Sequence, residues 1–195
     1  MAFLAAALRS PREVGTPVPS GPSLARRLAA VVPRGDVDGR RPVVVELGAG
    51  TGAVTGEIAK RVPPGSTLIA IERDAGMAQQ LRARGLGADV VTADARTLHQ
   101  ILAERGLERA DAIVSVLPWT LMTPGQQREL LAVLRDTLHP AGVFTAAAYS
   151  AGYPMPTARR FRGELERGFR EVVPTRSMWD NLPPAMTYIC RQPVT

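Results

Sequence analysis

Short apolar runs and segments of helical spacing alternate along the chain from residue 42 onward. The apolar runs are rich in β-branched residues and are bounded by glycine, proline or acidic residues, which predicts buried strands. These predicted strands cover residues 42–50, 67–74, 88–94, 110–119, 142–150, 170–179 and 186–192. Between the first six strands, apolar residues recur three and four positions apart. This spacing predicts helices at residues 52–62, 75–85, 96–106, 124–138 and 157–169.

The alternation of strands and helices predicts an α/β fold. Each strand–helix–strand unit implies a crossover between parallel strands, so we expect a seven-stranded, mostly parallel sheet with helices on both faces. Nearly continuous apolar strands fit a sheet that is buried on both sides. No helix separates the last two predicted strands, which predicts a C-terminal hairpin that adds an antiparallel strand.

Residues 1–41 differ from the rest of the chain in composition. They contain five prolines, four glycines and seven arginines against three acidic residues. The pattern predicts a short helix at about residues 3–9, a Pro/Gly turn region, and a second helix at about 23–32 with Ser23 as its N-cap. We therefore expect two parts: an N-terminal helical lid or membrane-contact segment, and one α/β domain over residues 42–195.

The composition restricts the class of protein. A chain of 195 residues that is 45% hydrophobic and 22% charged suits one packed domain. Its apolar runs are far shorter than the about 18–20 residues of a membrane-spanning helix, and the first ten residues lack the pattern of a secretory signal. One cysteine and two histidines predict neither an internal disulfide nor a metal centre. These features together predict a cytoplasmic protein.

The net charge of +6 comes almost entirely from arginine, since Lys60 is the only lysine. Codon usage in a GC-rich genome would explain this preference without any function. A guanidinium group also binds phosphate through two parallel hydrogen bonds, so partners that carry phosphate groups stay open. The net charge does not distinguish nucleic acid from an anionic membrane surface.

Three glycines, Gly48, Gly50 and Gly52, lie between the first predicted strand and the helix after it. Glycines there allow a tight turn and a close approach of a ligand to the backbone, while the helix N-terminus presents free N–H groups. With Ala53 the loop also fits the loose dinucleotide pattern G-x-G-x-x-G/A. A tight turn that binds no ligand is the less favoured alternative for the glycines alone.

Acidic residues stand at the ends of the first three predicted strands: Glu46, Glu72 and Asp94. Glu72 follows Gly52 by 20 residues, the position from which a carboxylate accepts hydrogen bonds from both ribose hydroxyls of a nucleoside. Asp94 is placed to reach an adenine amino group. Because the carboxyl ends of parallel strands meet at one edge of the sheet, we expect these three acids to line one ligand site.

The segments VELGAGTG, IAIERD, TADA and SVLPW together resemble the class I S-adenosylmethionine-dependent methyltransferases over residues 42–150. The resemblance implies a Rossmann-like domain that binds S-adenosylmethionine. It assigns Glu46 and the glycine loop to the methionine part of the cofactor, Glu72 to the ribose, and Asp94 with Ala95 to the adenine. Glu46 favours this family over nicotinamide enzymes, because in the methyltransferases this acid lies near the sulfonium end of the cofactor.

The fourth predicted strand ends in Ser115-Val-Leu-Pro-Trp119, and in this family that strand end faces the transferred methyl group. Nucleic-acid amino-methyltransferases have Asn or Asp where this chain has Ser115, followed by an aromatic residue that stacks on the base. We expect Ser115 and Tyr149 to act as catalytic residues, and Ser115 also to contact the cofactor. Trp119 and Tyr153 are candidates to surround a methylated ammonium by cation–π attraction. Packing in the core is the alternative role for Trp119.

Residues 3–29, FLAAALRSPREVGTPVPSGPSLARRLA, are similar to the start of soluble bacterial phospholipid N-methyltransferases. This similarity implies a small-molecule or lipid acceptor that carries an amine. The first predicted helix has a short apolar face beside Arg9 and Arg12, which suits docking on an anionic interface. We therefore expect residues 1–35 to contact an anionic membrane at its inner face. A lid helix that packs on its own domain is the alternative.

Other functions stay open at this point. An rRNA adenine N6-methyltransferase-like enzyme is disfavoured by Ser115 and by the lack of sequence for the small helical domain that those enzymes append, so nucleic acid ranks below lipid as a partner. A small-metabolite methyltransferase would use the N-terminal helices as its lid. A cofactor-binding scaffold without activity is the alternative of a different class. The sequence carries no signal for an oligomeric state.

Overall fold

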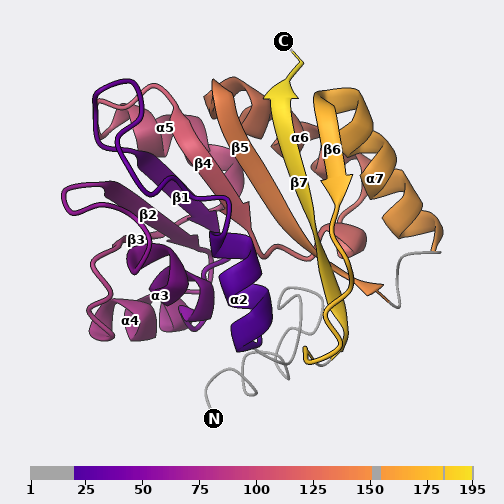
Figure 1. Cartoon of the computed structure of the whole chain (residues 1–195), viewed down its shortest axis with the longest axis horizontal. Coiled ribbons are helices and arrows are strands. Elements are labelled where there is room, and N and C mark those ends of the chain that lie inside the picture. Colours follow the sequence, from indigo (N-terminus) through magenta and orange to yellow (C-terminus); the bar gives the residue numbers. More distant parts are fainter. Residues whose placement is uncertain (1–19, 151–154, 182, 195) are drawn as a thin grey trace.

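The computed structural model describes residues 20–150, 155–181 and 183–194. Seven strands form a sheet in the order β3-β2-β1-β4-β5-β7-β6 (Figure 1). Strands β1 to β5 run parallel, and β7 pairs antiparallel with both β5 and β6. The strands are β1 (Val43–Leu47), β2 (Thr67–Glu72), β3 (Asp89–Thr92), β4 (Ala110–Ser115), β5 (Leu138–Tyr149), β6 (Phe169–Pro174) and β7 (Ala185–Pro193).

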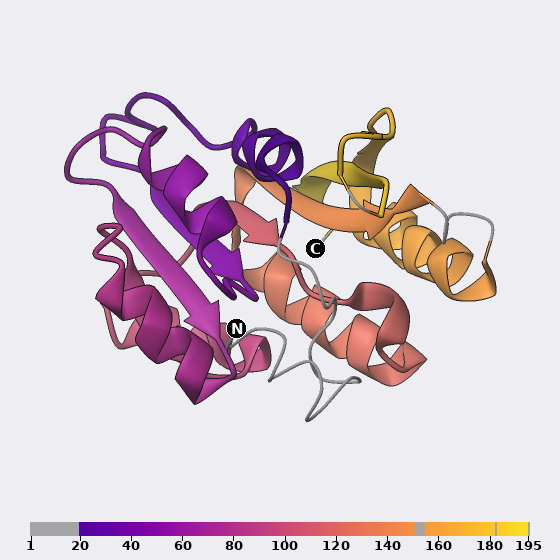
Figure 2. The same cartoon turned by 90° about the horizontal axis from the view of Figure 1, so that it is seen from below.

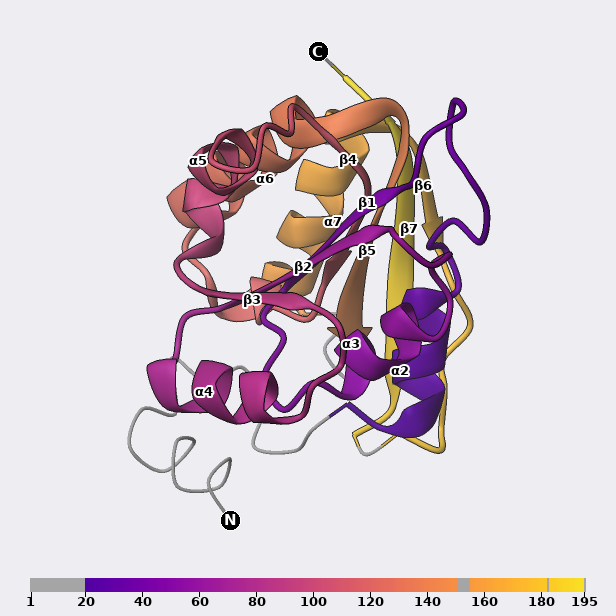
Figure 3. The ribbon, with the colours of Figure 1, turned by 90° about the vertical axis from the view of Figure 1, so that its left-hand side faces the viewer.

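Helices cover both faces of this sheet. They are α2 (Pro22–Ala29), α3 (Ala53–Ala59), α4 (Ala75–Ala83), α5 (Leu98–Ala103), α6 (Pro124–Thr137) and α7 (Pro156–Gly168), with 3₁₀ turns η1 (Ala95–Thr97) and η2 (Trp119–Leu121). Successive side chains of β2 point to opposite faces of the sheet, so their packing partners show which face each helix covers. Leu68 and Ala70 pack toward α2, α3 and α4, whereas Ile69 and Ile71 belong to the core beneath α5, α6 and α7 (Figure 3). The predicted Rossmann-like α/β fold and its C-terminal hairpin are confirmed.

The five parallel strands all end at the edge of the sheet that is lowest in Figure 1, here called the carboxyl edge. Because β6 and β7 run antiparallel to each other, the connection between them, residues 175–184, also lies at this edge. Figure 2 looks onto the carboxyl edge and shows α2 beside this connection. The fold therefore gathers the loops after β1, β2, β3 and β4 with the end of β5 and this connection.

Helix α2 is part of the domain core. Leu24, Ala25, Leu28, Ala29 and Val32 are buried with residues of α3 and of the sheet. The second half of the expected segment 1–41 thus shares one core with the α/β domain. The first predicted helix, at 3–9, lies outside the described residues, so the role of lid or membrane contact for that part stays a prediction.

Some boundaries differ from those expected. Gly21, rather than Ser23, is the N-cap of α2, because Pro22 occupies the first helical position. Strand β5 begins at Leu138, four residues earlier than predicted, directly after α6 ends at Thr137. Strand β4 ends at Ser115 and the chain turns into η2. Within the described ranges, no helix is long and apolar enough to cross a membrane.

Truncation of Leu28 tests whether α2 belongs to the core. Leu28 is fully buried, so Leu28→Ala is expected to lower the free energy of unfolding by about 2–5 kcal/mol in urea denaturation. Arg34→Ala, at an exposed position just after the same helix, serves as the control and is expected to stay within about 0.5 kcal/mol of the wild type. A Leu28→Ala protein as stable as this control would mean that α2 contributes nothing to the domain.

Candidate functional site

The predicted glycine loop connects β1 to α3 at the carboxyl edge. Gly48, Gly50 and Gly52 have φ angles of 75°, 54° and 80°, in the left-handed region that favours glycine. A Cβ at Gly52 would collide with the end of the buried Leu81 side chain of α4, so a larger residue there would force that side chain to move. The backbone N–H of Gly48 donates to the Ile71 carbonyl at 2.9 Å, which holds the loop against β2.

Glu72 ends β2, as predicted, and its carboxylate joins two loops. Oε2 accepts from the backbone N–H of Gly50 at 2.9 Å, and Oε1 accepts from the N–H of Asp74 at 2.9 Å. The side chain is only half-buried. An ionised carboxylate offers about four lone-pair sites, so both oxygens can accept further hydrogen bonds, such as those from a pair of ribose hydroxyls.

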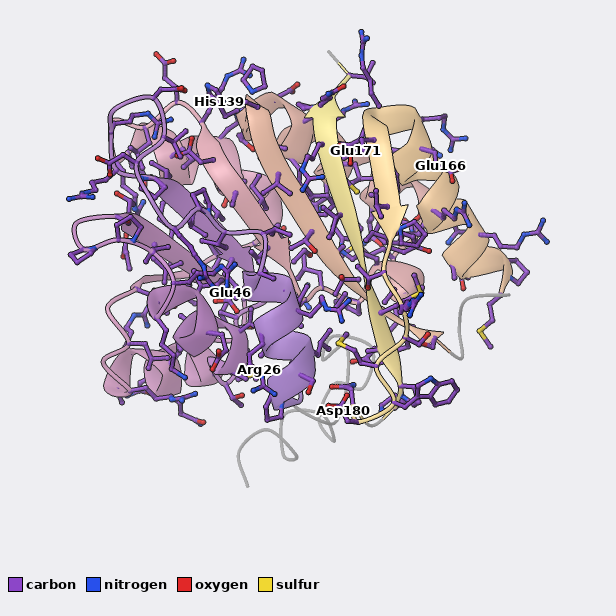
Figure 4. All side chains as sticks on the ribbon, viewed as in Figure 1. Arg26, Glu46, His139, Glu166, Glu171 and Asp180 are labelled. Carbon is purple, nitrogen blue, oxygen red and sulfur yellow. The ribbon has the colours of Figure 1, made fainter. Side chains whose placement is uncertain are left out.

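Glu46 is the penultimate residue of β1 and is completely buried. Its Oε2 accepts a hydrogen bond from the Thr55 hydroxyl of α3 at 2.6 Å. Among the described residues, Oε1 has no hydrogen-bond partner. Burial raises the pKa of Glu46 to about 8, against the opposing effect of the Thr55 hydrogen bond and with a smaller contribution from the negative charge of Glu72. Figure 4 labels Glu46 where β1 meets the helices of the α2–α3 face.

The unpartnered oxygen of Glu46 indicates which kind of ligand group would bind there. A buried acceptor without a donor is costly, and a cationic donor would both satisfy it and favour its ionised form. The ammonium group of an amino acid moiety has this chemistry. The chemistry of these acceptors therefore suits a ligand that carries an ammonium for Glu46 and ribose hydroxyls for Glu72.

Asp94 is not a strand end in the structure, because β3 stops at Thr92. Its carboxylate caps η1 by accepting from the N–H of Arg96 at 2.9 Å and also binds the Arg96 guanidinium through Nε at 3.0 Å and Nη2 at 2.9 Å. Hydrogen bonding to Arg96 lowers the pKa of Asp94. The following residue, Ala95, is buried beside it. A role of Asp94 and Ala95 toward adenine stays a prediction, and Arg96 competes for that carboxylate.

Ser115 ends β4 and is completely buried. Its Oγ accepts from the indole Nε1 of Trp119 at 2.9 Å, and the backbone N–H of Leu117 lies at 3.4 Å from the same atom. Trp119 is only 2% exposed and stacks on Phe161 of α7 at a centroid distance of 4.8 Å. The geometry thus favours the packing interpretation of Trp119 over contact with a substrate.

The structure does not bring the side chains of Ser115 and Tyr149 together. Ser115 lies two positions after Ile113 and is bonded to Trp119, both in the core beneath α5, α6 and α7. Tyr149 is half-buried and packs against the apolar cluster on the opposite face, with α2 and α3. Tyr153 lies outside the described residues.

Three side chains at this edge were not identified as site residues from the sequence alone. Thr55 binds Glu46, Arg96 binds Asp94, and Arg84 at the end of α4 donates to the Thr51 carbonyl of the glycine loop. Arg96 was the easiest to find, because it follows Asp94 by two residues. For Thr55 and Arg84 the sequence offers only the right residue types on the neighbouring helices.

The sequence of this chain is similar to those of known methyltransferases. The family described as "Methyltransferase domain" matches residues 44–142. The ornithine lipid N-methyltransferase of Singulisphaera acidiphila is 37% identical over 192 residues, which cover 97% of this chain and 94% of that protein.

Solved structures share the fold at low sequence identity. A TehB-like S-adenosylmethionine-dependent methyltransferase from Corynebacterium glutamicum superposes with a TM-score of 0.63 at 17% identity and covers 98% of both chains. A putative rRNA methylase from Clostridium thermocellum has a TM-score of 0.62 at 14% identity over 88% of this chain and 93% of its own.

The buried Glu46 predicts a pH-dependent difference in stability. Its pKa is raised in the folded protein, so the stability that depends on its proton is fully present below the unfolded-state pKa and is lost as the pH rises toward about 8. Glu46→Gln keeps the shape of the protonated form. In urea denaturation, the stability of this variant relative to wild type is expected to increase between pH 5 and 8, by at most about 1.4 kcal/mol per pH unit.

Glu57→Gln is the matched control, because Glu57 lies on α3 with its carboxyl on the surface beside Lys60. It is expected to show no such trend. A difference between Glu46→Gln and wild type that stays constant from pH 5 to 9 would contradict the buried, raised-pKa state of Glu46.

Proposed function

This chain belongs to the class I S-adenosylmethionine-dependent methyltransferases, and from that premise we propose that it methylates an amine on a membrane lipid of the ornithine-lipid kind. The single observation that carries the proposal is the 37% identity to an ornithine lipid N-methyltransferase, which extends over 97% of this chain. A likeness of that extent covers the N-terminal segment and the C-terminal hairpin as well as the cofactor domain.

The residues at the carboxyl edge support the cofactor half of the proposal. S-adenosylmethionine supplies an electrophilic methyl group on a sulfonium. In our proposal Glu46 accepts a hydrogen bond from the ammonium of its methionine part through the unpartnered Oε1, and Glu72 accepts from its ribose hydroxyls. The glycine loop brings backbone rather than side chains close to the cofactor.

Methyl transfer to an amine requires a neutral nucleophile, an approach in line with the breaking bond, and a place for the released proton. The Ser115 hydroxyl accepts from Trp119 and is no base at neutral pH. We therefore propose that Ser115 positions the end of β4 through its bond to Trp119, while solvent takes the proton. Tyr149 remains the candidate side chain at the end of β5 for contact with the acceptor.

The state of Trp119 favours lipid over nucleic acid as acceptor. An enzyme that methylates a base would present the aromatic residue after β4 for stacking on that base, as the resemblance to nucleic-acid methyltransferases requires. Here the indole is bonded to Ser115 and stacked on Phe161 inside the core. The rRNA methylase among the structural neighbours shares only the fold, at 14% identity, and therefore gives no support for nucleic acid as the acceptor.

The proposed place of action is the surface of an anionic membrane, which the enzyme contacts without spanning it. In this proposal residues 1–35 carry part of that contact, with the basic residues of α2 at its edge. Arg26 is exposed on α2, opposite the residues that this helix buries in the core.

Methyl transfer to lipid is the direct test. The purified protein is incubated with methyl-labelled S-adenosylmethionine and, in parallel, with mixed micelles of ornithine lipid, with phosphatidylethanolamine and with ribosomal RNA. Mass spectrometry is expected to find label in the ornithine lipid as N-methyl groups. Glu72→Ala is the matched control for catalysis, because loss of charge-assisted bonds of about 1.5–3 kcal/mol should weaken cofactor binding about tenfold or more.

Label that appears in ribosomal RNA and in neither lipid would contradict the proposed acceptor and leave the methyltransferase assignment intact. Label in phosphatidylethanolamine alone would keep a lipid amine as the acceptor and exclude the ornithine-lipid kind.

A further inference from the structure

Trp179 is the most exposed large apolar side chain among the described residues, with 79% of its surface accessible. It lies in the connection between β6 and β7, residues 175–184, at the carboxyl edge. The second tryptophan of the chain, Trp119, is 2% exposed, so the two residues occupy opposite environments. An indole presented to water is unfavourable unless something covers it.

The exposure of Trp179 does not result from a loosely attached connection. The preceding residue, Met178, is buried and exchanges two backbone hydrogen bonds with Ala185, at 2.7 and 3.2 Å. Asn181 is also buried, and its Oδ1 accepts from the N–H of Gly21 at 2.9 Å. The Ser150 hydroxyl donates to that of Ser177 at 2.8 Å. The backbone on both sides of Trp179 is therefore fixed while the indole points outward.

Basic side chains lie in the connection that carries Trp179 and on the adjoining helix α2. Arg176 is exposed three positions before it. The acidic neighbour, Asp180, accepts a hydrogen bond from Ser23 of α2, and Arg26 of the same helix donates to Ser23 at 3.4 Å. Figure 4 labels Arg26 and Asp180 at the same end of the molecule. The connection that carries Trp179 and the adjoining end of α2 thus present two arginines, Arg176 and Arg26, with one carboxylate that is already bound.

Two further exposed apolar side chains belong to the same edge. Leu121 is 59% exposed in η2, which follows β4, and Met155 is 57% exposed at the N-cap of α7, which follows β5. With Trp179 they form what we call the apolar rim: Leu121, Met155 and Trp179. The rim lies at the edge that carries the glycine loop and Glu72.

We propose that Trp179 anchors this enzyme in the headgroup region of an anionic lipid bilayer, with Arg176 and Arg26 against the lipid phosphates. Tryptophan is enriched at the membrane–water interface because its large ring carries a polar N–H, and basic residues bind the negative surface beside it. The inference rests on the proposed function, since a lipid amine reaches the carboxyl edge only if that edge faces the bilayer. The bilayer surface is the occupant that matches both the apolar rim and the basic charge.

Intrinsic fluorescence of the full-length protein tests this anchoring directly, because Trp119 is buried and provides a nearly constant background. Vesicles of phosphatidylglycerol and phosphatidylcholine are added at low salt. We expect the emission to shift to shorter wavelength and quenching by acrylamide to fall, and both changes should be absent in Trp179→Phe. A spectrum that does not respond to vesicles to which the protein binds would overturn the proposal.

Vesicle partitioning gives the second readout. Trp179→Ala is expected to lower the partition coefficient about tenfold or more, as the loss of a buried indole implies. Val194→Ala is the matched control, because Val194 is 38% exposed and follows β7 at the opposite edge of the sheet. Its partition coefficient should equal that of wild type. Equal partitioning of Trp179→Ala would overturn the proposal.

The outcomes separate this inference from the proposed function. Vesicle binding that depends on Trp179 without methylation of any lipid would leave the anchor standing and remove the proposed acceptor. Methylation of a lipid by a protein whose vesicle partitioning does not change in Trp179→Ala would support the proposed acceptor and remove the anchor.

The oligomeric state separates the bilayer from a second copy of the chain as the occupant of the apolar rim. A second copy is excluded if the molar mass in solution is independent of concentration. A concentration-dependent dimer in which the Trp179 emission is already shifted would overturn the bilayer as occupant.

Discussion

The carboxylate of Glu72 connects two loops at the carboxyl edge of the sheet, and the geometry of the candidate site depends on this connection. It accepts from the N–H of Gly50 in the loop after β1 and from the N–H of Asp74 in the loop after β2, each at 2.9 Å. This side chain, together with the backbone bond from Gly48 to Ile71, fixes the glycine turn relative to the neighbouring strand. The loop follows the buried Glu46 closely in the sequence, and the second oxygen of Glu46 has no partner among the described residues. In our proposal, the ribose of the cofactor lies at Glu72 and its ammonium at Glu46.

Much of this arrangement could be predicted from the sequence. The strand–helix alternation predicted the sheet and the presence of helices on both of its faces, since period and apolar content are properties of each segment alone. The glycine loop and Glu72 were found because their positions follow from a strand that ends at a turn. The parallel sheet then brings such strand ends to one edge.

Side-chain direction was harder to predict, because it depends on register. Ser115 pairs with Ala146 of β5, so Tyr149 lies three residues beyond that partner. An odd separation places the two side chains on opposite faces of the sheet, and the sequence does not specify this register. The burial of Trp119 was hidden for a related reason, since it depends on Phe161 from a helix 42 residues later.

Helix α2 and the connection between β6 and β7 lie far apart in the sequence and meet at the carboxyl edge. Gly21 donates to Asn181, and Ser23 donates to Asp180. The position of Trp179 at the surface therefore depends on a helix that the composition had suggested to be separate from the domain. These hydrogen bonds connect the segment that carries Trp179, the proposed membrane anchor, to the carboxyl edge of the domain.

Calorimetric titration with S-adenosylhomocysteine is the measurement that tests the account of this edge most directly. Wild-type protein is expected to bind it and not to bind NAD. Glu72→Gln should bind about tenfold more weakly or worse, because the amide presents a donor where the carboxylate accepts from a backbone N–H and, in our proposal, from ribose. Binding of NAD, or an affinity of Glu72→Gln for S-adenosylhomocysteine equal to that of wild type, would contradict the account.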